Sequence, residues 1–247
     1  MAAERRVRLD RLLVERGIAS SREKAQAMIL AGQVLVDGQK KEKCGAGVEA
    51  EAELRILGEE PRYVSRAGTK LEAALDYFAI DPGGKICLDV GASTGGFTHC
   101  LLERGAAKVI AVDVGTNQLD WKIRRDPRVL ALEKTNARTL GLAQTGSRAS
   151  LVTMDVSFIS SALILPALPP LMNPGAEILV LVKPQFEAGR EQVGKGGIVR
   201  DSEVQRQCVD KVTTRLVELG FKLSGSTPSV LPGARGNREF FVAATLP

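Results

Sequence analysis

A stretch in the first half of the chain, Lys85 to Thr98, constrains the possible folds more than any other part of the sequence. It begins with an apolar run rich in β-branched residues, Ile86 to Val90, which is typical of a buried strand. Gly91, Gly95 and Gly96 follow, and residues without a Cβ favour a tight turn. Helical spacing then resumes. A strand, a glycine turn and a helix N-terminus together predict a site for a polar ligand at the carboxyl end of a parallel strand.

Three known patterns can be compared with this turn. Gly91 to Gly95 fits G-x-S-x-G of the α/β-hydrolases, but that chemistry needs a histidine far downstream, and the only histidine is His99. The dinucleotide-binding pattern G-x-G-x-x-G fails because Ser93 takes the place of its second glycine. The third pattern, D-x-G-x-x-x-G beginning at Asp89, resembles the first motif of S-adenosylmethionine-dependent methyltransferases. That resemblance implies cofactor contacts from Asp89, Gly91, Ser93, Gly95 and Gly96. An ordinary strand-to-helix turn is the alternative.

Composition restricts the class of protein. The 247 residues are 44% hydrophobic and 26% charged, which excludes wholesale disorder, and a net charge of +5 favours an anionic partner. The four cysteines are scattered without a C-x-x-C pair, so neither a zinc site nor a disulfide framework is expected, and no metal is predicted. The charged N-terminus does not resemble a signal peptide, and no apolar run reaches 18 residues. We therefore expect a soluble, cytoplasmic protein without stable membrane association.

Residues 1–60 are expected to form a separate small α+β unit. Two helical patterns end at Gly17 and Gly32, and Val34 to Val36 lead into the hairpin turn Asp37-Gly38. Three segments, Arg8 to Val14, Ser20 to Ala25 and Ile29 to Gly38, closely resemble the S4 RNA-binding domain. The resemblance implies a structured RNA partner. Its implied phosphate contacts are Arg8, Arg11, Arg22 and Lys24, and Arg66 is added from the following segment. Charge alone favours the alternative that these basic residues are solvated helix faces.

Residues 61–69, short, basic and turn-prone, are expected to be a linker, with a second domain over residues 70–247. Beyond the glycine turn, apolar strands and helices alternate, which predicts a doubly covered, mostly parallel sheet. Asp113 ends the second strand about 20 residues past the turn, where an acid meets ribose hydroxyls in nucleoside-binding folds. Asn136 is a candidate for adenine contact or a simple turn former.

Charged residues also lie at the ends of later strands. Asp155 ends the fourth, and Lys183 closes an otherwise apolar fifth, where an unpaired lysine would be costly to desolvate. Glu239 opens the last strand and reaches the same edge if that strand is antiparallel. With Lys70 from the helix before the sheet, these residues resemble the Lys-Asp-Lys-Glu tetrad of FtsJ-type RNA 2′-O-methyltransferases.

The resemblance extends over nearly the whole chain. The segments Tyr63 to Arg66, Asp113 to Lys122, Asp155 to Ser160, Lys183 to Gly189 and Gly236 to Glu239 are similar to the TlyA family, which joins an S4 domain to an FtsJ-like methyltransferase. Membership implies a Rossmann-like domain with a mostly parallel seven-stranded sheet. It also implies S-adenosylmethionine as cofactor and ribosomal RNA as substrate, methylated on a cytidine ribose. Two positions, Thr69 and Gln205, depart from histidines common in the family; neither belongs to the tetrad.

The resemblance implies Lys70, Asp155, Lys183 and Glu239 as catalytic residues, with Asp155 also near the cofactor. Lys183 is expected to orient the ribose 2′-hydroxyl, because neighbouring carboxylates favour its charged form and disfavour a role as base. Two other functions stay open. One is an RNA-binding protein with an inactive methyltransferase domain, and the other is a membrane-lytic protein, because the family also carries a haemolysin label. The sequence does not determine the oligomeric state or the modified nucleotide.

Overall fold

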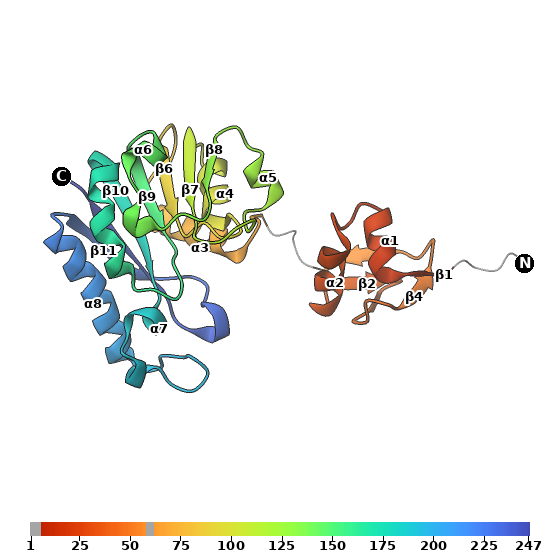
Figure 1. Ribbon diagram of the computed structural model, residues 1–247. Helices are drawn as coiled ribbons and strands as arrows, with labels where there is room; N and C mark the ends of the chain where they lie inside the picture. The colour runs from red at the N-terminus through yellow and green to blue at the C-terminus, as the bar shows by residue number, and fades with distance from the viewer. Residues whose placement is uncertain (1–5, 58–61) are drawn as a thin grey trace, which may run out of the picture. The chain divides into compact units, whose positions relative to one another are not determined.

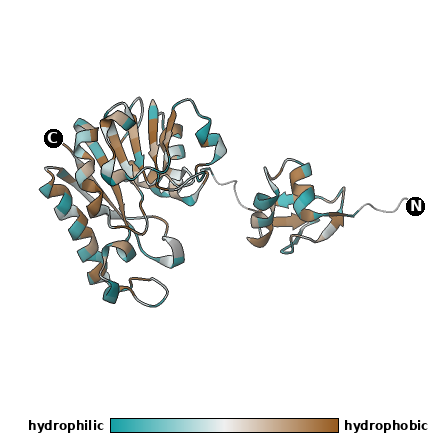
Figure 2. Ribbon diagram, in the orientation of Figure 1, coloured by the Kyte–Doolittle hydropathy of each residue, from teal (hydrophilic) through white to brown (hydrophobic). Residues whose placement is uncertain are grey.

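The computed structural model describes residues 6–57 and 62–247 and is drawn in Figure 1. The chain divides into two compact units, Met1–Glu60 and Pro61–Pro247. Each unit buries its own apolar side chains, so each is described by itself. Figure 2 shows that hydrophobic residues concentrate on the strands of the larger unit, while the long helix α8 (Ser202–Glu218) alternates between hydrophobic and hydrophilic residues.

The N-terminal unit packs two helices, α1 (Leu9–Glu15) and α2 (Arg22–Leu30), against short antiparallel strands. Ser21 caps α2, because its side chain accepts a hydrogen bond from the backbone N–H of Lys24. Apolar residues from both helices, including the fully buried Leu13 and Ile29, fill the core. The strands are β1 (Arg6–Arg8) paired with β4 (Gly47–Glu49), and β3 (Gln39–Lys40), β2 (Val34–Val36) and β5 (Leu54–Ile56) in a second sheet.

The larger unit is built on one seven-stranded sheet with the order β11-β12-β10-β9-β6-β7-β8. Strands β10, β9, β6, β7 and β8 all run parallel to one another. Strand β12 is antiparallel to both of its neighbours, β10 and β11. The strands are β6 (Ile86–Val90), β7 (Lys108–Val112), β8 (Val129–Leu132), β9 (Ala149–Met154), β10 (Met172–Val182), β11 (Lys222–Pro228) and β12 (Phe240–Thr245). The predicted fold, a mostly parallel seven-stranded sheet, is confirmed, and β12 has the antiparallel direction that Glu239 needs to reach the same edge.

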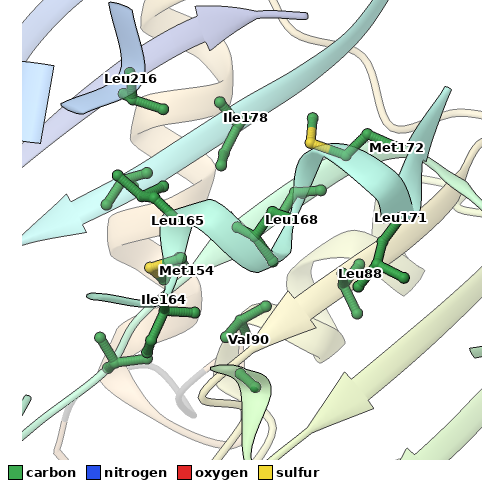
Figure 3. Packing of buried hydrophobic residues seen from close by; sticks show 14 of the residues in the cluster. Leu88, Val90, Met154, Ile164, Leu165, Leu168, Leu171, Met172, Ile178 and Leu216 are labelled. Carbon is green, nitrogen blue, oxygen red and sulfur yellow. The ribbon is translucent and has the colours of Figure 1, made fainter. Parts of the chain in front are cut away.

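Side chains alternate between the two faces of this sheet and form two cores. Leu71 of α3 and Leu101 of α4 share one core with Cys87 of β6. On the other face, Leu216 of α8 and residues of the 3₁₀ turns η3 (Leu165–Ala167) and η4 (Pro169–Leu171) share a second core with residues such as Ile178, as Figure 3 shows. The helices are α3 (Arg66–Tyr77), α4 (Gly96–Glu103), α5 (Trp121–Arg124), α6 (Leu142–Thr145), α7 (Pro184–Glu187) and α8; the 3₁₀ turns are η1 (Ala137–Thr139), η2 (Ser161–Leu163), η3 (Leu165–Ala167), η4 (Pro169–Leu171), η5 (Arg190–Gln192) and η6 (Ala234–Gly236). With both faces covered, the carboxyl ends of the parallel strands are where a ligand can reach the backbone.

The segment 61–69, expected to be a linker, requires correction. Pro61 lies outside the described residues, but Tyr63 is only 3% exposed and belongs to the core of the larger unit. Helix α3 begins at Arg66, inside the expected linker. The short polar and basic pattern suggested a loop, but Tyr63 packs against its neighbours, and its ring lies edge-on to His99.

Candidate active site

The turn between β6 and α4 adopts a backbone that only some residues tolerate. Gly91 has φ +85° and Gly95 has φ +92°, in the left-handed region that glycine adopts without steric cost. A Cβ on Gly91 would lie 2.4 Å from the carbonyl oxygen of Asp155, and a Cβ on Gly96 would lie 2.1 Å from the Ser65 hydroxyl. The three glycines therefore let α4 begin close to the end of β9 and to the segment before α3.

A cavity of about 340 Å³ opens beside this turn at the carboxyl ends of β6, β7 and β9. Apolar side chains such as Val112 and Ile164 form part of its wall, and polar residues such as Asp113 and Asn136 also line it. The Asp113 carboxylate accepts hydrogen bonds from the backbone N–H groups of Ser93 (2.8 Å) and Gly115 (2.7 Å), which fix its direction. The cavity is lined by Val90, Gly91, Ser93, Val112, Asp113, Val114, Gln118, Thr135, Asn136, Ala137, Asp155, Val156, Ser157, Phe158, Ile159 and Ile164.

A second, smaller cavity of about 140 Å³ is lined by the same glycine turn. It shares Gly91, Ser93, Asp155 and Ser157 with the first cavity, so the two adjoin. Its lining adds Lys183 and the start of α4. A ligand in the large cavity and a second one in the small cavity would therefore meet at Asp155 and Ser157.

Lys183 has two partners in the small cavity. Its Nζ lies 2.5 Å from Oδ1 of Asp155 and donates to the Ser157 hydroxyl at 2.9 Å. The side chains of Lys183 and Asp155 are 12% and 17% exposed, so this charge pair is shielded from bulk water and still reaches the cavity. An ammonium group has three N–H donors, so Lys183, with Asp155 and Ser157 as partners, keeps one N–H for a further acceptor.

Lys70 and Glu239 form the other predicted pair. Nζ of Lys70 donates to Oε2 of Glu239 at 2.6 Å, and both side chains are buried. Val182 of β10 pairs with Phe240 of β12, so Lys183 and Glu239 each lie one residue beyond that pair at the same edge of the sheet. The structure thus places all four residues along one rim as two ion pairs, although Lys70 and Glu239 line neither cavity described above.

Most of the residues expected around the cofactor line a cavity, with two exceptions. Gly91, Ser93, Asp113, Asn136 and Asp155 line the larger cavity, and Gly96 the smaller. Gly95 lines neither, and Asp89 lies fully buried beneath the turn. The carboxylate of Asp89 accepts hydrogen bonds from Thr98 (2.7 Å) and Thr153 (3.1 Å). Asp89 thus ties α4 and β9 to β6 and does not reach the cavities.

The basic residues expected to contact RNA lie at the surface. Arg11, Lys24 and Arg66 are exposed, and Arg66 donates to the carbonyl of Pro232 at 3.3 Å. Arg8 and Arg22 are half-exposed and share the buried carboxylate of Asp10. Sequence reasoning missed two residues of these sites, Asp10 and Ser157. Asp10 lies inside the S4-like segment Arg8 to Val14, where no spacing marks it as a partner of arginines, and Ser157 lies two residues past Asp155, where no periodic pattern marks it.

Comparison with known proteins agrees with this arrangement. Residues 63–246 match the FtsJ-like methyltransferase family, and residues 7–53 match the S4 domain. The chain is 48% identical over 239 residues to the 16S/23S rRNA (cytidine-2′-O)-methyltransferase TlyA of Mycobacterium tuberculosis, covering 96% of this chain and 89% of that protein. The chain belongs to the TlyA family.

Two further relatives have this organisation in common. The putative rRNA methyltransferase YqxC of Bacillus subtilis is 47% identical, and the match covers 95% of this chain and 84% of that protein. The solved structure of a putative hemolysin from Streptococcus thermophilus superimposes with a TM-score of 0.77 at 43% identity, covering 99% of this chain and 90% of that one. The predicted TlyA-family membership and methyltransferase activity are thereby confirmed.

The haemolysin name in this family raises the question of membrane insertion. Among the residues that the structure describes, no helix combines the length and the apolar character that crossing a bilayer requires.

Proposed function

We propose that this TlyA-family methyltransferase transfers the methyl group of S-adenosylmethionine to the ribose 2′-oxygen of a cytidine in ribosomal RNA. The observation that carries the proposal is the Lys183–Asp155 ion pair, set between a nucleoside-sized cavity and a second small cavity. The relatives named as cytidine-2′-O-methyltransferases of 16S and 23S rRNA support this choice of substrate. The proposal places the protein in the cytoplasm, with the ribosome.

The larger cavity suits the cofactor in size and chemistry. About 340 Å³ lies within the range of small-molecule sites. Apolar walls at Val112 and Ile164 suit an adenine ring, and Asp113 offers carboxylate oxygens to ribose hydroxyls at the end of β7. Asn136 lines the same cavity and could serve the adenine edge, although its side-chain oxygen already accepts from the Arg138 backbone N–H.

When bound, S-adenosylmethionine supplies an electrophilic methyl group next to a positively charged sulfur. The protein must then align the ribose oxygen, whose 2′-hydroxyl proton would pass to solvent water as the oxygen–methyl bond forms, the methyl–sulfur bond breaks and S-adenosylhomocysteine leaves. The free N–H of Lys183 can donate to the 2′-oxygen, hold it in line and stabilise negative charge as it develops. Asp155 fixes the position of the ammonium group, and the buried Lys70–Glu239 pair fixes the adjoining strand end.

The decisive test is to map ribose methylation on ribosomal RNA incubated with and without the protein and S-adenosylmethionine. Wild-type protein is expected to add a 2′-O-methyl group to a cytidine. Replacement of Lys70, Asp155, Lys183 or Glu239 by Ala is expected to lower turnover by about 100-fold or more, while RNA binding survives.

The matched control is Lys85→Ala. Lys85 also forms a 2.6 Å ion pair, with Glu177, but it precedes β6 at the opposite edge of the sheet, so turnover should be unchanged. Normal turnover of Lys183→Ala would overturn the site assignment. Lys183→Arg distinguishes orientation of the 2′-hydroxyl from general-base catalysis, because arginine cannot deprotonate in a protein. Unimpaired turnover of that variant would exclude Lys183 as a general base.

A further inference from the structure

The fully buried carboxylate of Asp10, at the start of α1, is shared by side chains from two elements. Arg8 donates from Nε to Oδ1 at 3.0 Å and from Nη2 to Oδ2 at 2.9 Å. Arg22, the first residue of α2, donates from Nε to Oδ2 at 2.9 Å, and Gln26 donates to the same oxygen at 3.0 Å. These donors lower the pKa of Asp10 well below its ordinary value, the hydrogen bond from Arg8 most of all, so the carboxylate stays ionised.

Each of the two arginines uses part of its guanidinium to contact Asp10, and its side chain is also exposed to solvent. Their side chains are 49% and 51% exposed, whereas the Asp10 side chain is 0% exposed. A guanidinium has five N–H donors, and Arg22 gives only its Nε–H to Asp10, so within residues 6–57 both of its Nη groups are left for an outside acceptor. Arg8 keeps Nη1 in the same way. Planar forks of this kind match phosphate oxygens, which accept two parallel N–H bonds.

We propose that Asp10 is a positioning residue for RNA binding, whose buried carboxylate holds Arg8 and Arg22 ready to bind backbone phosphates. The inference rests on the proposed function, in which the S4-type unit binds ribosomal RNA. Fixing two long side chains before the RNA arrives removes an entropic cost from binding, because that cost is met when the unit folds. The acid therefore strengthens binding to an anion, although its own charge repels that anion.

Simple electrostatics and this proposal predict effects of opposite sign for Asp10→Asn. The substitution raises the net charge by one, so added phosphate attraction alone would tighten RNA binding. The proposal expects weaker binding, by about tenfold, because both arginines lose their fixed direction. Glu15→Gln is the matched control: it makes the same charge change at an exposed position on α1 and should leave binding equal or slightly tighter.

The experiment measures binding of the full-length variants to purified small and large ribosomal subunits at several salt concentrations. Far-UV circular dichroism followed through thermal unfolding reports whether the N-terminal unit of each variant is folded, and S-adenosylmethionine affinity reports that the larger unit is intact. Weaker binding by a folded Asp10→Asn variant, with Glu15→Gln unaffected, supports the proposal. Binding by folded Asp10→Asn as tight as that of Glu15→Gln overturns it. Wild-type protein that fails to bind either subunit would instead count against the proposed function.

A second pair of variants keeps the test decisive if Asp10→Asn unfolds the unit. Arg22→Lys preserves charge at a half-exposed position, but one ammonium cannot easily contact Asp10 and a phosphate in the fork geometry of Arg22. We expect it to weaken binding by about fivefold. Arg55→Lys, at an exposed position on β5, is the control and should bind like wild type. Equal affinities of Arg22→Lys and Arg55→Lys would overturn the proposal.

Discussion

Asp89 illustrates how a residue in a binding motif can serve the fold. Its side chain is fully buried between α4 and β9, with hydroxyl donors from Thr98 and Thr153 on its two oxygens. Burial raises the pKa of Asp89 to about 7, although both hydrogen bonds act to lower it. An ionised carboxylate is therefore costly at this position, and the protonated form is favoured up to near-neutral pH.

This pKa predicts a pH dependence of stability. An acid whose pKa is higher in the folded state than in the unfolded chain stabilises least at high pH, because the unfolded chain ionises first. Stability should fall as pH rises from about 4 to about 7, by up to about 1.4 kcal/mol per pH unit, and then level off. Asp89→Asn removes the titrating group, so urea unfolding should show it gaining stability relative to wild type across this range. A constant difference between the two proteins from pH 4 to 7 would contradict the assignment.

At the scale of elements, glycine can be required for two reasons: a positive φ angle, or a neighbouring atom that leaves no space for a Cβ. Gly91 needs both its positive φ and the absence of a Cβ, because the carbonyl oxygen of Asp155 lies where that atom would go. Gly84, in the turn before β6, has φ +67°, but a Cβ added there would meet no atom within 4 Å. The two positions therefore differ in steric crowding more than in backbone conformation.

Gly91→Ala should lower S-adenosylmethionine affinity by at least about tenfold, because the turn must shift away from β9 and the cavity changes shape. Gly84→Ala should cost about 1 kcal/mol of stability through its left-handed backbone and leave cofactor affinity unchanged. Isothermal titration calorimetry and thermal unfolding distinguish the two effects. Equal cofactor affinities in both variants would show that crowding at Gly91 is unimportant to the site.

At the scale of the whole molecule, two units with separate cores divide the work that we propose. A ribose 2′-hydroxyl occurs on every nucleotide, so recognition of RNA shape has to come from contacts away from the reacting atom. The N-terminal unit presents Arg8, Arg11, Arg22 and Lys24 at its surface, whereas both cavities described above lie in the larger unit.

Residues 62–247 alone should therefore bind S-adenosylmethionine as tightly as the full chain. Their kcat/KM on ribosomal RNA should fall by at least about tenfold, because the phosphate contacts of the first unit are lost. Calorimetry and a methyl-transfer assay measure the two quantities on the same preparations. An undiminished kcat/KM would mean that the larger unit recognises the RNA by itself.

Local sequence pattern was sufficient for many of the elements. The apolar run Ile86 to Val90 predicted β6 with its observed bounds, and the glycines located the turn, because strand and turn preferences act over a few residues. The tetrad came from family resemblance, which located its members without showing which acid pairs with which lysine.

Tertiary structure decided those pairings and the burial of several side chains. Lys70 meets Glu239 across 169 residues of sequence, and Lys183 meets Asp155, because strand order and register bring separate segments to one rim. Packing also drew Tyr63 out of an expected linker into the core and placed Asp89 beneath the turn. Spacing along the chain contains no record of such contacts, since they depend on which strands lie side by side.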